Sequence, residues 1–206
     1  MPVMKESLVR WTLNGSEQTP LLCSPGNEED LLRGFLLTEG ISARGCDVHI
    51  HMPEGADDRF HVMTGSVSPP SCFPCESRLC LSLSSAEDLL SSLDGFPRAY
   101  GEHAVLLSDR NTQVCASDIS RHHALDKAVG KALSHDLQFS ECVLCLSARI
   151  SLEMVRKAVR ASIPVLVTRK AVGSLDAEEA LHSDCAIFCL ASPPEVFGAA
   201  WRLTRL

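Results

Sequence analysis

The strongest constraint on the fold lies in the second half of the chain, where apolar and amphipathic segments alternate. Three apolar runs of strand length begin at residues 142, 163 and 185 and read CVLCLSA, IPVLVTR and CAIFCLA. The amphipathic segments SLEMVRKAVRAS and LDAEEALHS, which have helical periodicity, separate them. Continuous apolar runs are typical of strands buried on both faces, and helical crossovers between them give a parallel sheet. We therefore expect a parallel sheet covered by helices.

The segments before residue 142 predict the rest of the architecture. HAVLLS and TQVCAS flank the turn DRN and predict an antiparallel hairpin on the same sheet, followed by a helix over SRHHALDKAVGKALSHDL. Nearer the N-terminus we expect a helix capped by Asn27 and ended by Gly40, and a second helix with a capping box from Ser84 to Glu87. DVHIHM and FHVMTGSV predict two strands, with His49 and His51 on one face as exposed histidines or a metal pair.

The predicted fold class is therefore α/β, with a mixed sheet sandwiched by helices, an antiparallel hairpin and a smaller N-terminal part. The N-terminal part would cover residues 1–83 and the core residues 84–206, or the two would form one continuous domain.

Composition excludes several classes of protein. The chain has 206 residues and a net charge of −7, and no run of Lys and Arg exceeds two residues, so a nucleic-acid groove is not expected. No apolar run approaches the roughly 18 residues of a membrane span, and the first residues, MPVMKESLVRW, lack the apolar core of a signal peptide. We expect a cytoplasmic protein without a membrane segment. In a reducing compartment, spaced cysteines indicate metal binding or catalysis more often than disulfides, although free cysteine is also a common core residue.

The stretch SCFPCESRLC carries a C-x-x-C pair, Cys72 and Cys75, with Cys80 five residues later. Pro69, Pro70 and Pro74 block a helix or an inner strand, so the pair should lie on an exposed loop. A tetrahedral zinc site needs about four ligands, and Cys80 and a histidine would have to complete it. Thiol chemistry needs only an accessible thiolate and a second thiol to resolve it. From the residues alone, thiol transfer, zinc binding and the absence of a function remain open.

A second polar cluster begins the helix at SDISRHHALDK. Asp118 or Ser120 is expected to cap this helix, which places Arg121 and His122 in its first turn, where backbone N–H groups favour an anion. Asp126 follows His122 by one helical turn and is expected to orient its imidazole. His103 begins the strand in YGEHAVLL. The alternative interpretation is a solvated helix start and a hydrogen-bonded edge histidine.

Taken in order, these segments resemble the FdhD family of formate dehydrogenase accessory sulfurtransferases over most of residues 10–190. The likeness rests on LLRGFLLTEGI, SCFPC, YGEHAVLL, SDISRHHALDKAVGKAL and LSARISLEMVRKAVRASIPVLVT. The resemblance implies a homodimer with a cytidine-deaminase-like fold. It also implies that sulfur is accepted as a cysteine persulfide from a cysteine desulfurase and passed to the molybdenum cofactor, in its bis-guanine-dinucleotide form, for formate dehydrogenase. By position, Cys72 would carry the persulfide and Cys75 would assist, and no tightly bound metal is expected.

The resemblance also implies a cofactor pocket, in which this sequence departs from the family. His103, Arg121 and His122 would line the pocket and hold the cofactor or a GDP-like nucleotide. Tyr100-Gly101-Glu102 stands where the family has TGG, which adds a negative charge. The family's C-terminal guanine-dinucleotide segment has lost its arginines, for which Arg202 and Arg205 would substitute. Its residues here are Phe188, Cys189, Leu190, Ala191, Ser192 and Pro193.

These departures keep two other hypotheses open. The chain would be a diverged, non-catalytic paralogue that binds a nucleotide or formate dehydrogenase, or a zinc protein that uses Cys72, Cys75 and Cys80. Zinc-dependent deamination is not expected, because no H-x-E precedes the C-x-x-C and the nearest upstream proline is two residues before Cys72.

Overall fold

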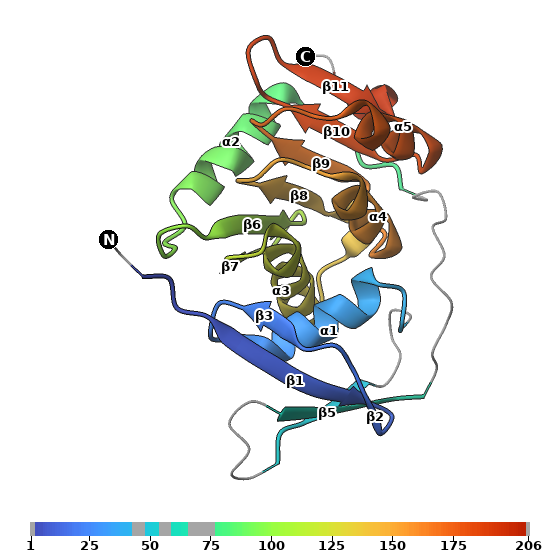
Figure 1. Ribbon diagram of the computed structural model, residues 1–206. Helices are drawn as coiled ribbons and strands as arrows, with labels where there is room; N and C mark the ends of the chain where they lie inside the picture. The colour runs from blue at the N-terminus through green and yellow to red at the C-terminus, as the bar shows by residue number, and fades with distance from the viewer. Residues whose placement is uncertain (1–2, 43–47, 54–58, 66–76, 205–206) are drawn as a thin grey trace.

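The computed structural model describes residues 3–42, 48–53, 59–65 and 77–204. Within these residues, five α-helices and two β-sheets form a larger and a smaller layered unit (Figure 1). The larger sheet has six strands in the order β11-β10-β9-β8-β6-β7, and the smaller has five.

The centre of the larger sheet is parallel, as the apolar runs predict. Its strands are β8 (Val143–Leu146), β9 (Val165–Thr168) and β10 (Ala186–Cys189), and every residue in them is buried. The helices α4 (Leu152–Arg160) and α5 (Ser174–His182) make the crossovers. The expected hairpin is also present: β6 (His103–Ser108) and β7 (Gln113–Asp118) pair antiparallel, and β6 runs antiparallel to β8. At the other edge, β11 (Glu195–Gly198) pairs antiparallel with β10.

Helices cover both faces of this sheet. On one face, α3 (Arg121–Ser134), α4 and α5 bury an apolar cluster with Leu107, Leu144 and Ile187. On the other face, α2 (Leu83–Asp94) packs Leu90 and Leu93 against the sheet. Two short 3₁₀ turns, Phe139–Glu141 and Ala200–Arg202, complete the unit. The predicted mixed sheet sandwiched by helices is confirmed.

The smaller sheet comes from the N-terminal part of the chain. It contains β1 (Ser7–Leu13), β2 (Ser16–Glu17), β3 (Leu21–Cys23), β4 (Val48–His51) and β5 (Arg59–Thr64). The antiparallel pair β4–β5 confirms the two predicted strands and sets His51 opposite His61. The helix α1 (Glu28–Thr38) buries Leu31, Leu32 and Leu36 in a core shared with this sheet. The division of the chain at residue 83 stays a prediction.

Two glycines allow α1 and α3 to touch along their backbones. A Cβ added at Gly34 would lie 1.8 Å from the backbone oxygen of Asp126, and one added at Gly130 would lie 1.9 Å from that of Asp30. Real carbon atoms do not approach an oxygen this closely, so any side chain at either position pushes the helices apart. This contact fixes α1 against the helix that begins with Arg121.

Helix ends differ in detail from the expectations. Asn27 is the N-cap of α1, but it adopts a left-handed conformation and its side chain makes no capping bond. The N-cap of α2 is Ser82, whose hydroxyl accepts a hydrogen bond from Ser85 N, so the capping box predicted from Ser84 to Glu87 is wrong. The run SLSS offers several equivalent serines, and the chain begins the helix at the earliest one. None of the helices in the described part of the chain is long and apolar enough to cross a membrane.

Candidate functional site

The topology gathers the predicted site at one edge of the larger sheet. The carboxyl ends of the parallel strands β8, β9 and β10 meet there, and antiparallel pairing brings the start of β6 and the end of β7 to the same edge. In Figure 1 this edge is on the left of the large sheet. Open α/β sheets usually bind ligands at this end of their strands. His103 therefore lies on the same edge as the loops 119–121, 147–151 and 190–193.

The first turn of α3 is held by two side chains at its start. Ser120 is the N-cap, and its Oγ accepts a hydrogen bond from His123 N at 3.4 Å. Asp118 Oδ1 accepts one from Ser120 N at 2.9 Å, so both residues named as possible caps take part. Arg121 and His122 follow in the first turn, where helix N–H groups and the helix dipole favour a negative charge.

A buried ion pair positions this turn. The side chains of Asp118 and Lys127 are almost completely buried, and Lys127 Nζ lies 2.9 Å from Asp118 Oδ2. Ser24 joins them, because its backbone N–H donates to Asp118 at 3.0 Å and its carbonyl accepts from Lys127 at 2.7 Å. These bonds tie the end of β7 and the body of α3 to the N-terminal segment.

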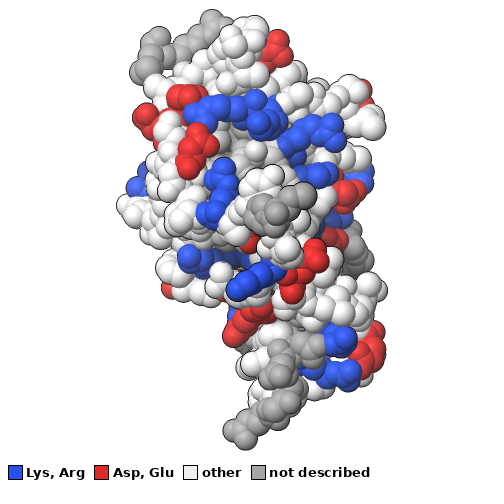
Figure 2. Space-filling model, turned by 60° about the vertical axis from the view of Figure 1, so that its left-hand side comes forward, with Lys and Arg blue, Asp and Glu red and all other residues white. Residues whose placement is uncertain are grey.

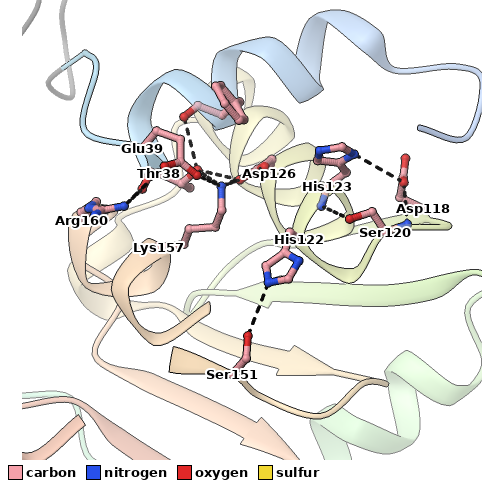
Figure 3. Close-up of polar contacts among 11 residues, drawn as sticks. Thr38, Glu39, Asp118, Ser120, His122, His123, Asp126, Ser151, Lys157 and Arg160 are labelled. Carbon is pink, nitrogen blue, oxygen red and sulfur yellow. Dashed lines mark hydrogen bonds and ion pairs between the residues drawn. The ribbon is translucent and has the colours of Figure 1, made fainter. Parts of the chain in front are cut away.

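A second buried network lies one turn further along α3 (Figure 3). Lys157 Nζ donates to Asp126 Oδ1 at 2.9 Å and approaches Glu39 Oε1 at 2.6 Å, and Thr38 Oγ1 donates to Asp126 at 2.6 Å. Arg160 reaches Glu39 at 3.6 Å. The network connects α1, α3 and α4, which no local sequence pattern indicates, because its members are up to 122 positions apart.

The expected pairing of His122 with Asp126 is therefore wrong. The carboxylate of Asp126 points into the interior toward Lys157 and Thr38, whereas His122 Nε2 lies 3.4 Å from Ser151 Oγ (Figure 3). Ser151 is the N-cap of α4. The starts of α3 and α4 thus converge on His122.

Both predicted histidines have a lowered pKa. Burial lowers the pKa of His122, and the nearby positive charges of Arg121 and Lys157 lower it further. Burial also lowers the pKa of His103, with Arg121 and Arg98 adding to the effect. The structure therefore brings His103, Arg121 and His122 into one electrostatic environment, and both imidazoles are neutral near pH 7.

The same edge is rich in positive charge despite the net charge of the chain. Arg98, Arg149 and Lys170 are exposed in its loops, and Figure 2 shows Lys and Arg side chains spread over this side of the molecule. The buried Nε of Arg121 has no hydrogen-bond partner among the described residues. An anionic ligand bound at this helix start would supply the hydrogen-bond acceptor that this buried donor lacks.

Only part of the segment 188–193 is available to a ligand. Phe188 and Cys189 are buried in β10, and Phe188 packs in the apolar cluster beneath α2. Leu190 N donates to Thr168 O at 2.7 Å, and Ala191, Ser192 and Pro193 are exposed at the edge beyond.

The substitution of Arg202 for the missing arginines is wrong. Arg202 is completely buried, and its guanidinium donates to the backbone oxygens of Asp184, Ser77 and Leu79. Asp184 precedes β10, so Arg202 lies at the opposite edge of the sheet from His103. Arg205 lies outside the described residues.

Cys72 and Cys75 also lie outside the described residues, so their prediction as the reactive pair stays a prediction. The description resumes at Ser77, which Arg202 holds at the edge opposite His103. Cys80 is exposed, and the six other described cysteines are buried or half-buried. Burial raises the pKa of Cys23 to about 11 and also raises that of Cys145, which makes these thiols poor nucleophiles. Among the described residues no group of three or more His, Cys, Asp and Glu side chains is arranged to hold a metal.

Comparison with known proteins establishes the family. The model of the FdhD/NarQ family matches residues 76–202, which is more than half of the chain. The chain belongs to the FdhD/NarQ family. A relative from Staphylococcus aureus, named Sulfur carrier protein FdhD, is 27% identical over 195 aligned positions, covering 79% of this chain and 74% of the relative. A relative of the same name from Wolinella succinogenes is 26% identical over 200 positions, covering 82% and 70%.

A solved structure shows the same fold. The crystal structure of a formate dehydrogenase accessory protein from Desulfotalea psychrophila superposes with a TM-score of 0.82 at 21% identity, covering 97% of this chain and 90% of that one. The family match starts one residue after Cys75, so it includes the helix α3 and the edge around His103 but not the C-x-x-C. The family recognised from the sequence is confirmed.

Proposed function

We propose that this protein accepts sulfur as a persulfide from a cysteine desulfurase and delivers it to the molybdenum cofactor, in its bis-guanine-dinucleotide form, for formate dehydrogenase. The observation that carries the proposal is the name of its relatives, sulfur carrier, together with the retained pair Cys72 and Cys75. The proposal includes a cytoplasmic homodimer.

Loading is a thiol exchange at Cys72. The Cys72 thiolate attacks the outer sulfur of the donor's persulfide, a new S–S bond forms, and the donor cysteine leaves as a thiolate. No external oxidant or reductant is needed, because the outer sulfur moves without a change in its oxidation state. The other thiols described are poor competitors, since all but Cys80 are buried or half-buried.

Delivery requires the outer sulfur to gain two electrons and become sulfide. Cys75 supplies them when its thiolate attacks the inner sulfur of the Cys72 persulfide, which forms a Cys72–Cys75 disulfide and releases hydrosulfide to the acceptor. A cellular dithiol then reduces this disulfide and restores both thiols.

The edge around His103 suits the acceptor, which is a substrate of the protein rather than a resident cofactor. The phosphate groups of the acceptor would accept hydrogen bonds from the unsatisfied Nε of Arg121 and from the backbone N–H groups in the first turn of α3. The exposed Arg149 and Lys170 add positive charge at the same edge. The neutral imidazole of His122 would accept or donate a proton at Nε2, where Ser151 is its partner.

Incubation with a cysteine desulfurase and cysteine, followed by intact-mass spectrometry, tests the loading step. We expect a gain of one sulfur atom in the wild type and no gain in Cys72→Ala/Cys75→Ala. Cys80→Ala is the matched control, because its thiol is exposed but has no role in the proposal, and it should load normally. No gain in the wild type, or a gain that survives loss of both cysteines, would exclude the proposed chemistry.

A further inference from the structure

Three histidines that the proposed function does not use lie on one face of the smaller sheet. β4 and β5 pair antiparallel, with His51 directly opposite His61 and His49 opposite Met63. The apolar side chains that alternate with them belong to the core that this sheet shares with α1. The histidines therefore lie on the face away from α1, where His49 and His51 are exposed and His61 is half-buried. In Figure 1, β5 is at the bottom of the molecule, far from the larger sheet.

The pairing of His51 with His61 suits a metal ion that is held by two imidazoles. Directly opposed side chains on an antiparallel pair have Cβ atoms about 4.5–5.5 Å apart. Two Zn–N bonds of about 2.0–2.1 Å in a tetrahedral site place their nitrogens roughly 3.3 Å apart, a distance that a change of side-chain rotamer can produce. His51 can rotate in this way, because its exposed imidazole has no hydrogen-bond partner among the described residues.

A hydrogen bond on the neighbouring strand prepares His61 as a ligand. The parallel register of β1 and β5 sets Thr12 opposite His61, and Thr12 Oγ1 lies 2.9 Å from His61 Nδ1. When Nδ1 donates to this hydroxyl, the lone pair is on Nε2, which is then the atom that binds a metal. Metal-binding histidines usually donate their second N–H in this way. β5 is also paired on both sides, with β1 and β4, so its backbone is held in place.

The histidine pair that the sequence spacing indicates is a different one. His49 and His51 share a face of β4, but they are successive outward positions of one strand and lie about 7 Å apart along it. The cross-strand pair brings two imidazoles closer, and it depends on the register between β4 and β5.

We propose that His51 and His61 form a surface site for a divalent transition-metal ion that prefers imidazole nitrogen, namely Zn²⁺ or Cu²⁺. Water supplies the remaining ligands, which agrees with the absence, in the part of the chain that the structure describes, of a group of three or more His, Cys, Asp and Glu ligands. The bound ion links β4 to β5 and stabilises the folded sheet, to which alone it binds. The site does not use the cysteines, so it goes beyond the proposed function.

Calorimetric titration with Zn²⁺ tests the site. The parent protein is the full chain with Cys72→Ala/Cys75→Ala, in which the C-x-x-C thiols cannot compete for zinc. We expect the parent to bind one ion per chain. His51→Ala should weaken the binding at least tenfold, because it leaves a single imidazole. Thr12→Val should weaken it about tenfold, because the hydroxyl that orients the second imidazole is lost.

His49→Ala is the matched control. His49 is exposed on the same face of the same strand, but it lies opposite Met63, so its removal should change the affinity for Zn²⁺ less than twofold. Saturating Zn²⁺ should also raise the midpoint of thermal unfolding of the parent and leave that of His51→Ala unchanged. Without metal the two proteins should unfold alike, because His51 is exposed.

Three results would overturn the inference. These are absence of Zn²⁺ binding by the parent, stoichiometric binding that survives His51→Ala, and a loss in His49→Ala as large as that in His51→Ala. The last result would place the ion on one strand rather than across two. None of the three bears on persulfide loading, which is measured with Cys72 and Cys75 present.

Discussion

The buried contact between Lys157 and Asp126 makes a quantitative prediction about stability. Both side chains are almost fully buried, at 5% and 0% exposed, and they are joined by hydrogen bonds of 2.9 and 3.1 Å. In Lys157→Met a side chain of similar length fills the space, but among the residues that the structure describes only Thr38 is left to donate a hydrogen bond to the carboxylate of Asp126. Leaving one partner of a buried pair uncompensated costs about 3–5 kcal/mol.

Urea unfolding followed by tryptophan fluorescence measures this cost. With a slope of about 2–3 kcal/mol per molar for a chain of this size, the midpoint should fall by roughly 1–2.5 M. Lys170→Met is the matched control, because Lys170 is exposed, and it should change stability by less than about 0.5 kcal/mol. Replacing both partners, in Asp126→Leu/Lys157→Met, should recover part of the loss, because no charge is then left buried alone.

The pH dependence has a definite sign. Burial raises the pKa of Asp126, and Lys157 partly offsets this, so removing Lys157 raises it further. A carboxyl whose pKa is higher in the folded than in the unfolded state contributes stability at low pH that is lost as pH rises through the folded value. The deficit of Lys157→Met relative to wild type should therefore shrink from pH 7.5 to pH 5. A midpoint shift below about 0.3 M, a deficit that grows toward pH 5, or a double variant as unstable as the sum of the single ones would refute the reasoning.

Three further predictions concern the helix contact, the histidines and the thiols. Gly34→Ala should lower the free energy of unfolding by at least about 2 kcal/mol, measured by thermal unfolding, because the added Cβ meets the backbone of α3. Gly65→Ala is the control, because the space around Gly65 is open, and it should not lower stability in this way. Equal effects of the two substitutions would contradict the close contact between α1 and α3. In NMR titrations His122 and His103 should protonate below the ordinary midpoint of 6.5, and Arg121→Leu should raise both midpoints; unchanged midpoints would show that Arg121 does not set their environment. Under native conditions, peptide-level maleimide labelling should modify Cys80 before Cys23 or Cys145, and early labelling of Cys145 would contradict its burial.

The sequence predicted most of the fold because the buried strands and the amphipathic helices carry strong local patterns. The parallel order of β8, β9 and β10, the β6–β7 hairpin and the pair β4–β5 all follow from such patterns. The cap of α2 was misplaced because several serines near its start are chemically equivalent. The role of Asp126 was misassigned for a different reason. Helical spacing places the carboxylate of Asp126 one turn from His122. The buried Lys157, 31 positions away, pairs with this carboxylate instead, because a charge without a partner is costly in the interior.

The site was predictable only in part for the same reason. The helix start with Arg121 and His122 follows from a local motif, whereas Ser151 as the partner of His122 and Ser24 as the partner of Asp118 depend on tertiary contacts. Tyr100 and Glu102 stand out in the sequence only because they depart from the family pattern. The hydrogen bond that Ser117 on β7 donates to the carboxylate of Glu102 is a tertiary contact that no local pattern indicates.

Transfer of labelled sulfur is the most direct test of the central claim. The protein is loaded from ³⁵S-cysteine by a cysteine desulfurase, separated from the donor and mixed with the molybdenum cofactor in its bis-guanine-dinucleotide form. We expect the label to leave the protein and appear on the cofactor, and Cys72→Ala/Cys75→Ala to deliver none. Label that stays on the loaded protein in the presence of the cofactor would contradict it.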